Sequence, residues 1–202
     1  YYFGRIRRTA ARDIRTAVLM ALSSRRMFCE NGREASEINT FKGLMPMIKI
    51  MFVCHGNICR STMAEFVMKE LVRRAGAADR FLIASSATSR EEIGHDTYIG
   101  TKEKLREQGI PFTRRQAVQL TRQDGETYDK ILAMDQENLR NIRRIVDARQ
   151  MHKVFRLLSF AGEEADIADP WYTGDFDAAY ADVERGCTAL LKQLLAAGKE
   201  RG

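Results

Sequence analysis

The stretch from Cys54 to Arg60 constrains the fold of this chain more than any other part of the sequence. It consists of a cysteine, five further residues and an arginine. The residues before it, 48–53, form an apolar run that predicts a buried strand. The residues after it, 62–71, place apolar side chains at the spacing 0, 3, 4, 7 of one helical face. The sequence therefore predicts a tight loop between a buried strand and the N-terminus of a helix.

This loop has the features of an anion site. Successive backbone N–H groups from His55 to Arg60 can point inward, and the dipole of the following helix adds positive potential. The guanidinium of Arg60 is a planar fork that matches two oxygens of a phosphate. The same surroundings favour the thiolate form of Cys54. We therefore expect the loop to hold a phosphoryl group directly against a nucleophilic sulfur.

Residues 54–61, Cys-His-Gly-Asn-Ile-Cys-Arg-Ser, resemble the phosphate loop of the low-molecular-weight protein tyrosine phosphatases, with its paired cysteines. The resemblance runs from about Met47 to near the C-terminus, and it is renewed at residues 85–94, 131–135 and 169–172. It implies a flavodoxin-like α/β fold, in which a four-stranded parallel sheet is flanked by helices. It also implies a cysteine-dependent hydrolase of phosphotyrosine in proteins that needs neither a cofactor nor a metal ion.

The chain itself alternates predicted strands and helices after residue 47. Further strands are expected at 80–85, 128–134 and 152–158, and the last helix is expected at 176–197. Such alternation is typical of a parallel sheet with helices on both faces. Ligands of these sheets bind beyond the carboxyl ends of the strands, where the loop at Cys54 would lie.

Helix ends are marked by a few residues. Asp96 is a candidate cap for a helix that runs to Gly109, where glycine can adopt a left-handed backbone. Asp135 is expected to cap the helix that follows the third strand. Gly198 is expected to end the last helix.

Hydrolysis of a phosphate ester through a covalent intermediate needs a nucleophile, an oxyanion clamp and a proton donor. We assign Cys54 as the nucleophile and Arg60 as the clamp. Asp169 is the expected general acid and base, because it begins an Asp-Pro-Trp-Tyr segment that matches the acid loop of the family. Proline fixes the backbone just after the acid, and the two aromatic residues could line a slot for a phenyl ring.

The remaining site residues come from the loop and from the aromatic pair. Ser61 is expected to donate to the Cys54 thiolate, and Asn57 is expected to tie the loop to its neighbours, with Ser85 as a candidate partner. The residues expected to contact the substrate are His55, Gly56, Asn57, Ile58, Cys59, Ser61, Trp171 and Tyr172.

The cysteines other than Cys54 have different interpretations. Cys59 is either a small buried residue or a resolving thiol that pairs with Cys54 after oxidation, and the resemblance favours the redox role. Cys187 lies on the apolar stripe of the last predicted helix and is expected in the core. Cys29 lies in the first 46 residues.

The sequence departs from the family at particular positions. Thr62 stands where the family usually has proline after the serine, although this change removes no catalytic group. Arg115 falls about where many members have a histidine that braces the loop asparagine, which puts that support in doubt. Glu91 occupies a rim position that is often aromatic, so binding of the phenyl ring or the preference for flanking sequence would differ.

The basic character of the chain is concentrated at its start. The formal net charge is +6, but residues 1–46 hold nine Lys and Arg against four Asp and Glu, whereas residues 47–202 hold 24 against 23. A general nucleic-acid surface is therefore not indicated. We interpret 1–46 as a basic N-terminal extension of doubtful native status, upstream of a native start at Met45 or Met47, or else as a loosely docked native extension. Residues 47–202 form the expected phosphatase domain.

Cysteine content and hydropathy suggest where the protein works. Four cysteines in 202 residues do not make a secreted disulfide scaffold. No apolar run reaches the ~18 residues of a membrane span. We therefore expect a cytoplasmic monomer or weak dimer that binds phosphotyrosine-containing proteins and neither nucleic acid nor membrane.

Related functions remain as alternatives. Protein-arginine phosphatases look similar but carry threonine where this chain has Ile58, and an apolar side chain suits an aryl ring better. Arsenate reductases of the same fold need a downstream cysteine pair, and only Cys187 follows the loop. A phosphate- or phosphotyrosine-binding module would not need both Cys54 and Asp169, and a phosphocarrier would not need Arg60 with the Asp-Pro loop.

Overall fold

The centre of the fold is a parallel sheet. The computed structural model describes residues 47–199, and its strands are β1 (Ile48–Cys54), β2 (Phe81–Ala87), β3 (Lys130–Ala133) and β4 (Val154–Arg156). All pairings are parallel and the strand order is β2-β1-β3-β4. This confirms the predicted four-stranded α/β fold. Because the chain leaves β1 toward β2 on one side and reaches β3 on the other, the carboxyl end of β1 is the switch point at which such sheets bind ligands.

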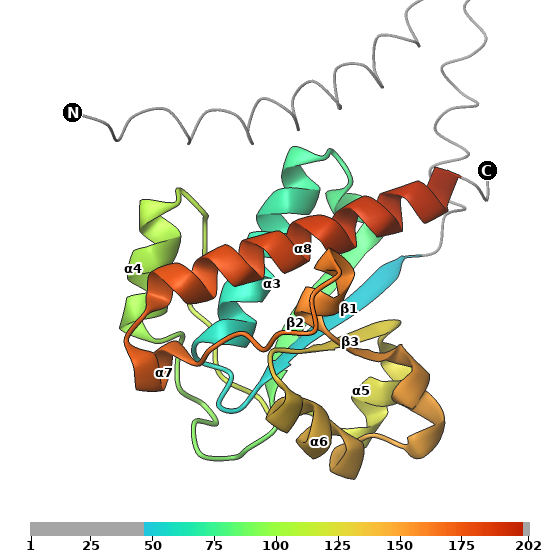
Figure 1. Cartoon of the computed structure of the whole chain (residues 1–202), viewed down its shortest axis with the longest axis horizontal. Coiled ribbons are helices and arrows are strands. Elements are labelled where there is room, and N and C mark those ends of the chain that lie inside the picture. Colours follow the sequence, from blue (N-terminus) through green and yellow to red (C-terminus); the bar gives the residue numbers. More distant parts are fainter. Residues whose placement is uncertain (1–46, 200–202) are drawn as a thin grey trace, which may run out of the picture. The chain divides into compact units, whose positions relative to one another are not determined.

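Helices cover both faces of this sheet (Figure 1). On one face α3 (Arg60–Arg74) packs against β1 and β2, and α8 (Phe176–Lys199) packs on α3. On the other face α6 (Gln136–Ile145) packs against β3 and β4. The remaining helices are α4 (Ile99–Glu107), α5 (Arg122–Thr127) and α7 (Pro170–Thr173), together with 3₁₀ turns at Ala78–Arg80, Ala148–Lys153 and Leu157–Ala161.

Alternation along β1 divides the core into two layers. Ile50, Phe52 and Cys54 point to the layer under α3 and α8, whereas Met51 and Val53 point to the layer under α6. Successive strand residues face opposite sides of a sheet, so a strand buried on both sides must be apolar throughout.

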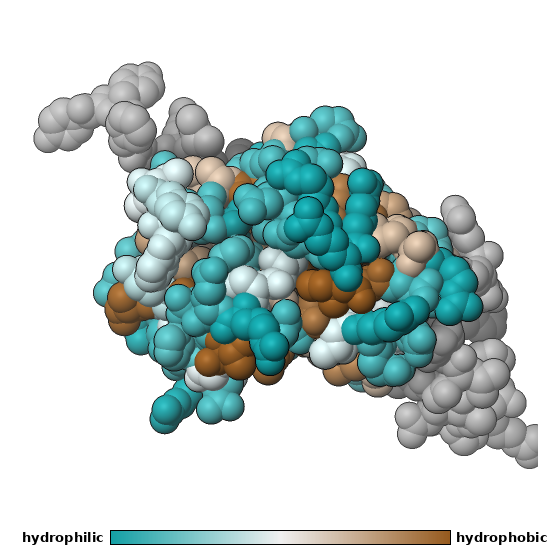
Figure 2. All heavy atoms as spheres, turned by 90° about the horizontal axis from the view of Figure 1, so that it is seen from below, coloured by the Kyte–Doolittle hydropathy of each residue, from teal (hydrophilic) through white to brown (hydrophobic). Residues whose placement is uncertain are grey.

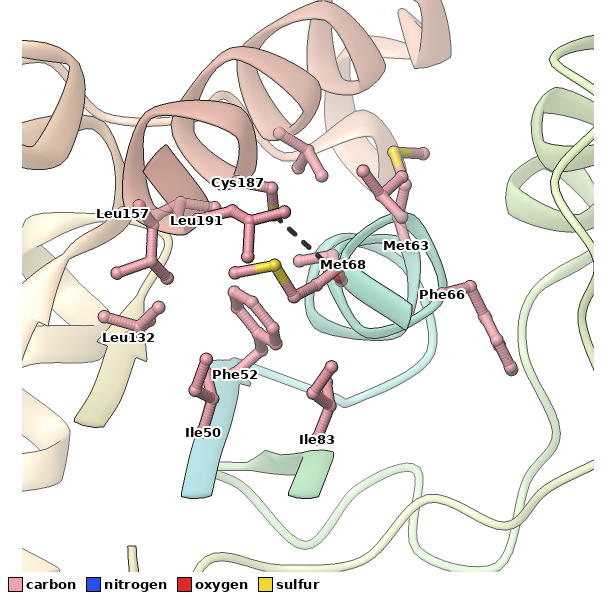
Figure 3. Close-up of a cluster of buried hydrophobic side chains, with 14 of the residues drawn as sticks. Ile50, Phe52, Met63, Phe66, Met68, Ile83, Leu132, Leu157, Cys187 and Leu191 are labelled. Carbon is pink, nitrogen blue, oxygen red and sulfur yellow. Dashed lines mark hydrogen bonds between the residues drawn. The ribbon is translucent and has the colours of Figure 1, made fainter. Parts of the chain in front are cut away.

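The larger core layer is formed by the strands, α3 and α8. Figure 3 shows Phe52 between the methionines of α3 and the residues of α8. The thiol of Cys187 is fully buried there and donates to the carbonyl of Ala64 at 3.8 Å. The expectation that Cys187 is a core residue is confirmed.

The ends of several elements differ from the sequence predictions. The strand expected at 152–158 is shorter, because only Val154–Arg156 pairs with β3 and the residues on either side form 3₁₀ turns. The short helices α5 and α7 were not expected. Gly198 does not end the last helix, which continues to Lys199.

The helix expected after Asp96 begins later than predicted. Its N-cap residue is Tyr98, and Asp96 instead accepts hydrogen bonds from the backbone N–H groups of Thr97 and Arg115. The prediction for Asp135 is confirmed, since its carboxylate accepts from the N–H of Asn138 at 2.5 Å.

The expectations for the first 46 residues, including Cys29 and a native start at Met45, lie outside the described residues. None of the helices within 47–199 is long and apolar enough to cross a membrane.

Candidate active site

The loop at the end of β1 wraps around the sulfur of Cys54. The N–H of Asn57 donates to this sulfur at 3.3 Å, and the thiol lies 3.1 Å from the hydroxyl oxygen of Ser61. Asn57 has a φ of 60°, a left-handed conformation that asparagine tolerates better than most residues. The expected tight turn and the expected contact of Ser61 are both present. When Cys54 is a thiolate, the same Ser61 contact lets the hydroxyl donate to the sulfur.

Asn57 connects this loop to the strands and loops behind it. Its side-chain amide donates to the hydroxyl oxygens of Ser61 and Ser85, each at 2.8 Å. Its side-chain carbonyl accepts from the backbone N–H of Val118 at 3.2 Å. Asn57 and Ser61 are completely buried. Their side chains therefore form the frame of the loop and do not line the hollow above it.

Arg115 supplies the brace that the sequence comparison put in doubt. Its guanidinium donates to the backbone carbonyl of Asn57 at 3.0 Å and to its side-chain carbonyl at 2.8 Å. Behind it lies the buried carboxylate of Glu65, 3.6 Å from Arg115 Nε, which also accepts from the Ser85 hydroxyl at 2.6 Å. Burial lowers the pKa of Arg115, although Glu65, Cys54 and Asp96 oppose that shift.

Replacement of Arg115 by alanine is expected to weaken both the loop and the fold. It removes both contacts to the carbonyl groups of Asn57 and leaves the buried carboxylate of Glu65 with a weaker set of partners. We expect turnover of a small aryl phosphate to fall about 10- to 100-fold, because a small displacement of reacting groups is costly. We expect the free energy of unfolding, measured by urea denaturation, to fall by about 3 kcal/mol.

The control for this prediction is Arg114→Ala, which removes an exposed arginine next to it in the chain. Arg115→Lys keeps the charge but loses the fork, so partial rescue is expected. If the alanine variant loses stability but keeps full turnover, Arg115 supports the fold and not the geometry of the loop.

Arg60 lies beneath the other side of the loop and is only 3% exposed. It donates to Asp135 at 2.6 Å, to the carbonyl of Ile167 at 2.8 Å and to Asp169. Burial opposes the charge of Arg60, but Cys54, Asp169 and Asp135 outweigh it and raise the pKa of the guanidinium. Its buried Nε has no hydrogen-bond partner within the described residues. A phosphate oxygen is an acceptor that this N–H group could use.

Asp135 was expected only as a helix cap, and its role at the site was missed. One of its oxygens caps α6 while the other holds Arg60, although the two residues are 75 positions apart in the chain. The repeated resemblance at 131–135 was the only signal in the sequence that could have pointed to it.

Asp169 reaches the site from the loop before α8. It is the N-cap of α7, where one carboxylate oxygen accepts from the N–H of Trp171 at 3.1 Å and the other accepts from Arg60. Pro170 occupies the first turn of this short helix and fixes its direction. The structure thus places the expected acid in the same hollow as Cys54, separated from it by more than a hundred residues of chain.

A hollow opens above the sulfur and collects most of the expected residues. Aromatic side chains form part of it, since Trp171 contacts Tyr98 edge-to-face with ring centres 5.1 Å apart. The residues that line it are Cys54, His55, Gly56, Ile58, Cys59, Glu91, Glu92, Asp169, Trp171 and Tyr172. Within 47–199, no three His, Cys, Asp or Glu side chains are grouped so that they could hold a metal ion.

Cys59 lies in the same hollow as Cys54 but in a different chemical state. It is 4% exposed, and burial, together with the nearby Cys54 and Asp169, raises the pKa of its thiol to about 12. Cys59 is therefore a neutral thiol near pH 7. Both cysteines are free in this structure. The two interpretations of Cys59, core residue and resolving thiol, are both compatible with this position.

Known proteins resemble this chain over nearly its whole described part. A family model described as "Low molecular weight phosphotyrosine protein phosphatase" matches residues 49–200. YfkJ of Bacillus subtilis, a low molecular weight protein-tyrosine-phosphatase, is 36% identical over 150 residues, which cover 73% of this chain and 96% of YfkJ. PtpA of Staphylococcus epidermidis, with the same description, is 35% identical over 150 residues, which cover 74% and 95%.

Solved structures give the same result. The crystal structure of Bacillus subtilis YfkJ matches with a TM-score of 0.72 and 36% identity, and the match covers 75% of this chain and 96% of YfkJ. The crystal structure of SP-PTP, a low molecular weight protein tyrosine phosphatase of Streptococcus pyogenes, matches with a TM-score of 0.67 and 38% identity. That match covers 73% of this chain and 93% of SP-PTP.

Proposed function

Because the chain belongs to the low molecular weight phosphotyrosine protein phosphatase family, we infer that it hydrolyses phosphotyrosine in proteins through a phosphocysteine intermediate. The observation that carries this function is the placement of Cys54. Its sulfur is at the base of a hollow, receives a backbone N–H, and shares the hollow with the carboxylate of Asp169. Arg60 lies beside the same carboxylate with an unpartnered buried N–H.

In the first step the Cys54 thiolate attacks phosphorus. The S–P bond forms as the bond between phosphorus and the phenolic oxygen breaks, and Asp169 gives its proton to the departing phenolate. The loop amides and Arg60 stabilise the charge on the equatorial oxygens. In the second step water attacks the phosphocysteine, Asp169 takes a proton from that water, and the S–P bond breaks. Ser61 then donates to the thiolate that leaves.

The contact between Arg60 and Asp169 fits this sequence of events. Paired with a guanidinium, a carboxylate is held in its charged form and cannot serve as an acid. A phosphate that takes over the N–H groups of Arg60 competes for that pairing. Asp169 is then free to carry the proton that the leaving phenolate needs.

Ile58 supports tyrosine over arginine as the dephosphorylated residue. It lines the hollow and is 8% exposed, packed with Cys59, Ala117 and Phe176. This wall offers a phenyl ring an apolar contact and offers a guanidinium no hydrogen-bond acceptor from its side chain. Protein-arginine phosphatase activity is the alternative that a polar residue at this position would favour.

The test compares phosphate release from phosphotyrosine and phosphoarginine peptides of the same sequence, with EDTA present. We expect at least about tenfold preference for phosphotyrosine, since differences in apolar and polar contacts of this size separate related substrates. We expect Ile58→Thr to reduce that preference. Preference for phosphoarginine would replace the proposed substrate. Tight phosphate binding without any turnover would indicate a binding module.

We further propose that the protein acts in the cytoplasm on phosphotyrosine-containing proteins, as a monomer or weak dimer, and binds no nucleic acid. The free cysteines Cys54, Cys59 and Cys187 support a reducing compartment. The nearly balanced charge of residues 47–202 supports the absence of nucleic acid binding. Apolar residues form separate patches on the face in Figure 2, which supports weak self-association at most.

A further inference from the structure

Two glutamates form one wall of the hollow above Cys54, which we call the acidic wall. Glu91 and Glu92 lie in the segment after β2, and both line the hollow together with the aromatic side chains of Trp171 and Tyr172. A protein segment that delivers a phosphotyrosine to Cys54 must therefore pass close to these carboxylates. Hydrophilic residues also occupy much of the face in Figure 2, which is viewed from the side of this segment and of α6.

The acidic wall is fixed to the phosphate loop. Glu91 Oε2 lies 2.9 Å from Nε2 of His55, and the side chain of Glu92 lies close enough to Gly56 that a Cβ there would meet it at 3.0 Å. The backbone N–H groups of Thr88 and Ser89 also donate to the carbonyls of Cys54 and His55, at 2.9 and 3.0 Å. The two carboxylates thus keep their place relative to the bound phosphoryl group.

The charge of this wall is poorly compensated by its surroundings. The partners of Glu91 and Glu92 are the imidazoles of His55 and His95, which carry a charge only when protonated. No lysine or arginine lines this hollow. Arg90 precedes the wall in the chain but is not among the lining residues, and the Glu91 side chain remains 72% exposed.

A second hollow on the other side of Asp169 has a more balanced charge. It shares His55, Asp169 and Tyr172 with the first hollow but also contains Arg60 and Arg140. The acids that line it are Asp135, Glu137, Asp166 and Asp169. Arg60 pairs with Asp135 and Asp169, and Asp166 pairs with Arg156. Arg140 lies three positions after Glu137 on α6, at a spacing that lets opposite charges attract.

We propose that Glu91 and Glu92 determine specificity by selecting protein segments that carry lysine or arginine next to the phosphotyrosine. The proposal rests on the proposed phosphatase function and names the class of its substrates. Near the phosphate dianion, two carboxylates repel both the dianion and any acidic neighbour. A cationic side chain beside the phosphotyrosine removes this repulsion and gains an attraction to the wall.

The size of the effect follows from the exposure of the wall. An exposed ion pair changes an equilibrium by about 1.4- to 5-fold. Exchanging glutamate for lysine in the substrate both removes repulsion and adds attraction, so we expect about a tenfold difference in kcat/KM. Because exposed charges are screened by salt, this difference should shrink toward unity in ~1 M salt.

The test uses the full chain and three peptides that differ only in whether lysine, alanine or glutamate flanks the phosphotyrosine. 4-Nitrophenyl phosphate is the probe without flanking residues. The variants are Glu91→Gln, Glu92→Gln and the double variant. The matched control is Glu103→Gln, which makes the same charge change at an exposed position that lines neither hollow. The quantity compared is the ratio of kcat/KM for the lysine and glutamate peptides within each variant.

We expect a ratio of about ten for the wild type and for Glu103→Gln at low salt, and a ratio of about two for the double variant. A wild-type ratio of one or less, with 4-nitrophenyl phosphate still hydrolysed, would overturn this proposal alone. A high ratio that the double variant retains would also overturn it. Absence of turnover on every substrate would overturn the proposed function and this inference with it.

Discussion

Replacement of Cys54 by serine is expected to stop turnover almost completely. The hydroxyl is a far weaker nucleophile than a thiolate in this loop, and no other thiolate is available, since the neighbouring Cys59 has its pKa raised to about 12 by burial. We expect kcat for a phosphotyrosine peptide to fall by at least about 10⁴-fold, as when other enzymes lose their nucleophile. Binding of inorganic phosphate should persist, because the loop amides and Arg60 are unchanged.

The measurement is single-turnover kinetics combined with calorimetry of phosphate binding. Cys187→Ala is the matched control, because it removes another buried thiol that lies in the core under α8 and outside the hollow. That control is expected to lose some stability and keep its kcat. If Cys54→Ser retains a phosphoenzyme intermediate, another residue is the nucleophile and the assignment is wrong.

Replacement of Asp169 by asparagine is expected to slow the reaction without unfolding the protein. Asparagine is as good an N-cap as aspartate, so α7 keeps its first turn. Loss of a general acid and base typically costs about 10² to 10⁴ in rate. The loss should be larger for phosphotyrosine than for 4-nitrophenyl phosphate, because the phenolate of tyrosine is the more basic leaving group and needs the proton more.

The measurement is kcat for both substrates in the variant and in the wild type. Asp175→Asn is the matched control, because Asp175 also caps a helix, accepting from the N–H of Ala178 at 2.8 Å, and does not line the hollow. An equal loss on both substrates would mean that Asp169 contributes through its contact with Arg60 and not as a proton donor.

The phosphate loop could be predicted from the sequence because its parts are adjacent in the chain. The strand before Cys54, the turn at Asn57 and the helix from Arg60 are each specified by a few neighbouring residues, through apolar runs, tolerance of a left-handed backbone and helical spacing. The parallel sheet followed from the alternation of strands and helices.

The limits of the elements were less predictable, because packing overrides local preference at their ends. The predicted strand at 152–158 keeps only Val154–Arg156, since β3 offers no more backbone to pair with there. The helix at Arg122–Thr127 depends on a reciprocal cap between Thr121 and Asp124 within a short polar segment that lacks an apolar period.

By itself the sequence determined the nucleophile, the oxyanion clamp and the chemistry that they share, because a local strand–loop–helix unit holds them. Only the tertiary structure decided what surrounds them. Arg60 meets Asp135 and Asp169 across 75 and 109 residues, and Arg115 meets Asn57 across 58. These partners come together because the carboxyl ends of parallel strands lie side by side, so their loops converge on one point. No pattern along the chain specifies which charges meet there.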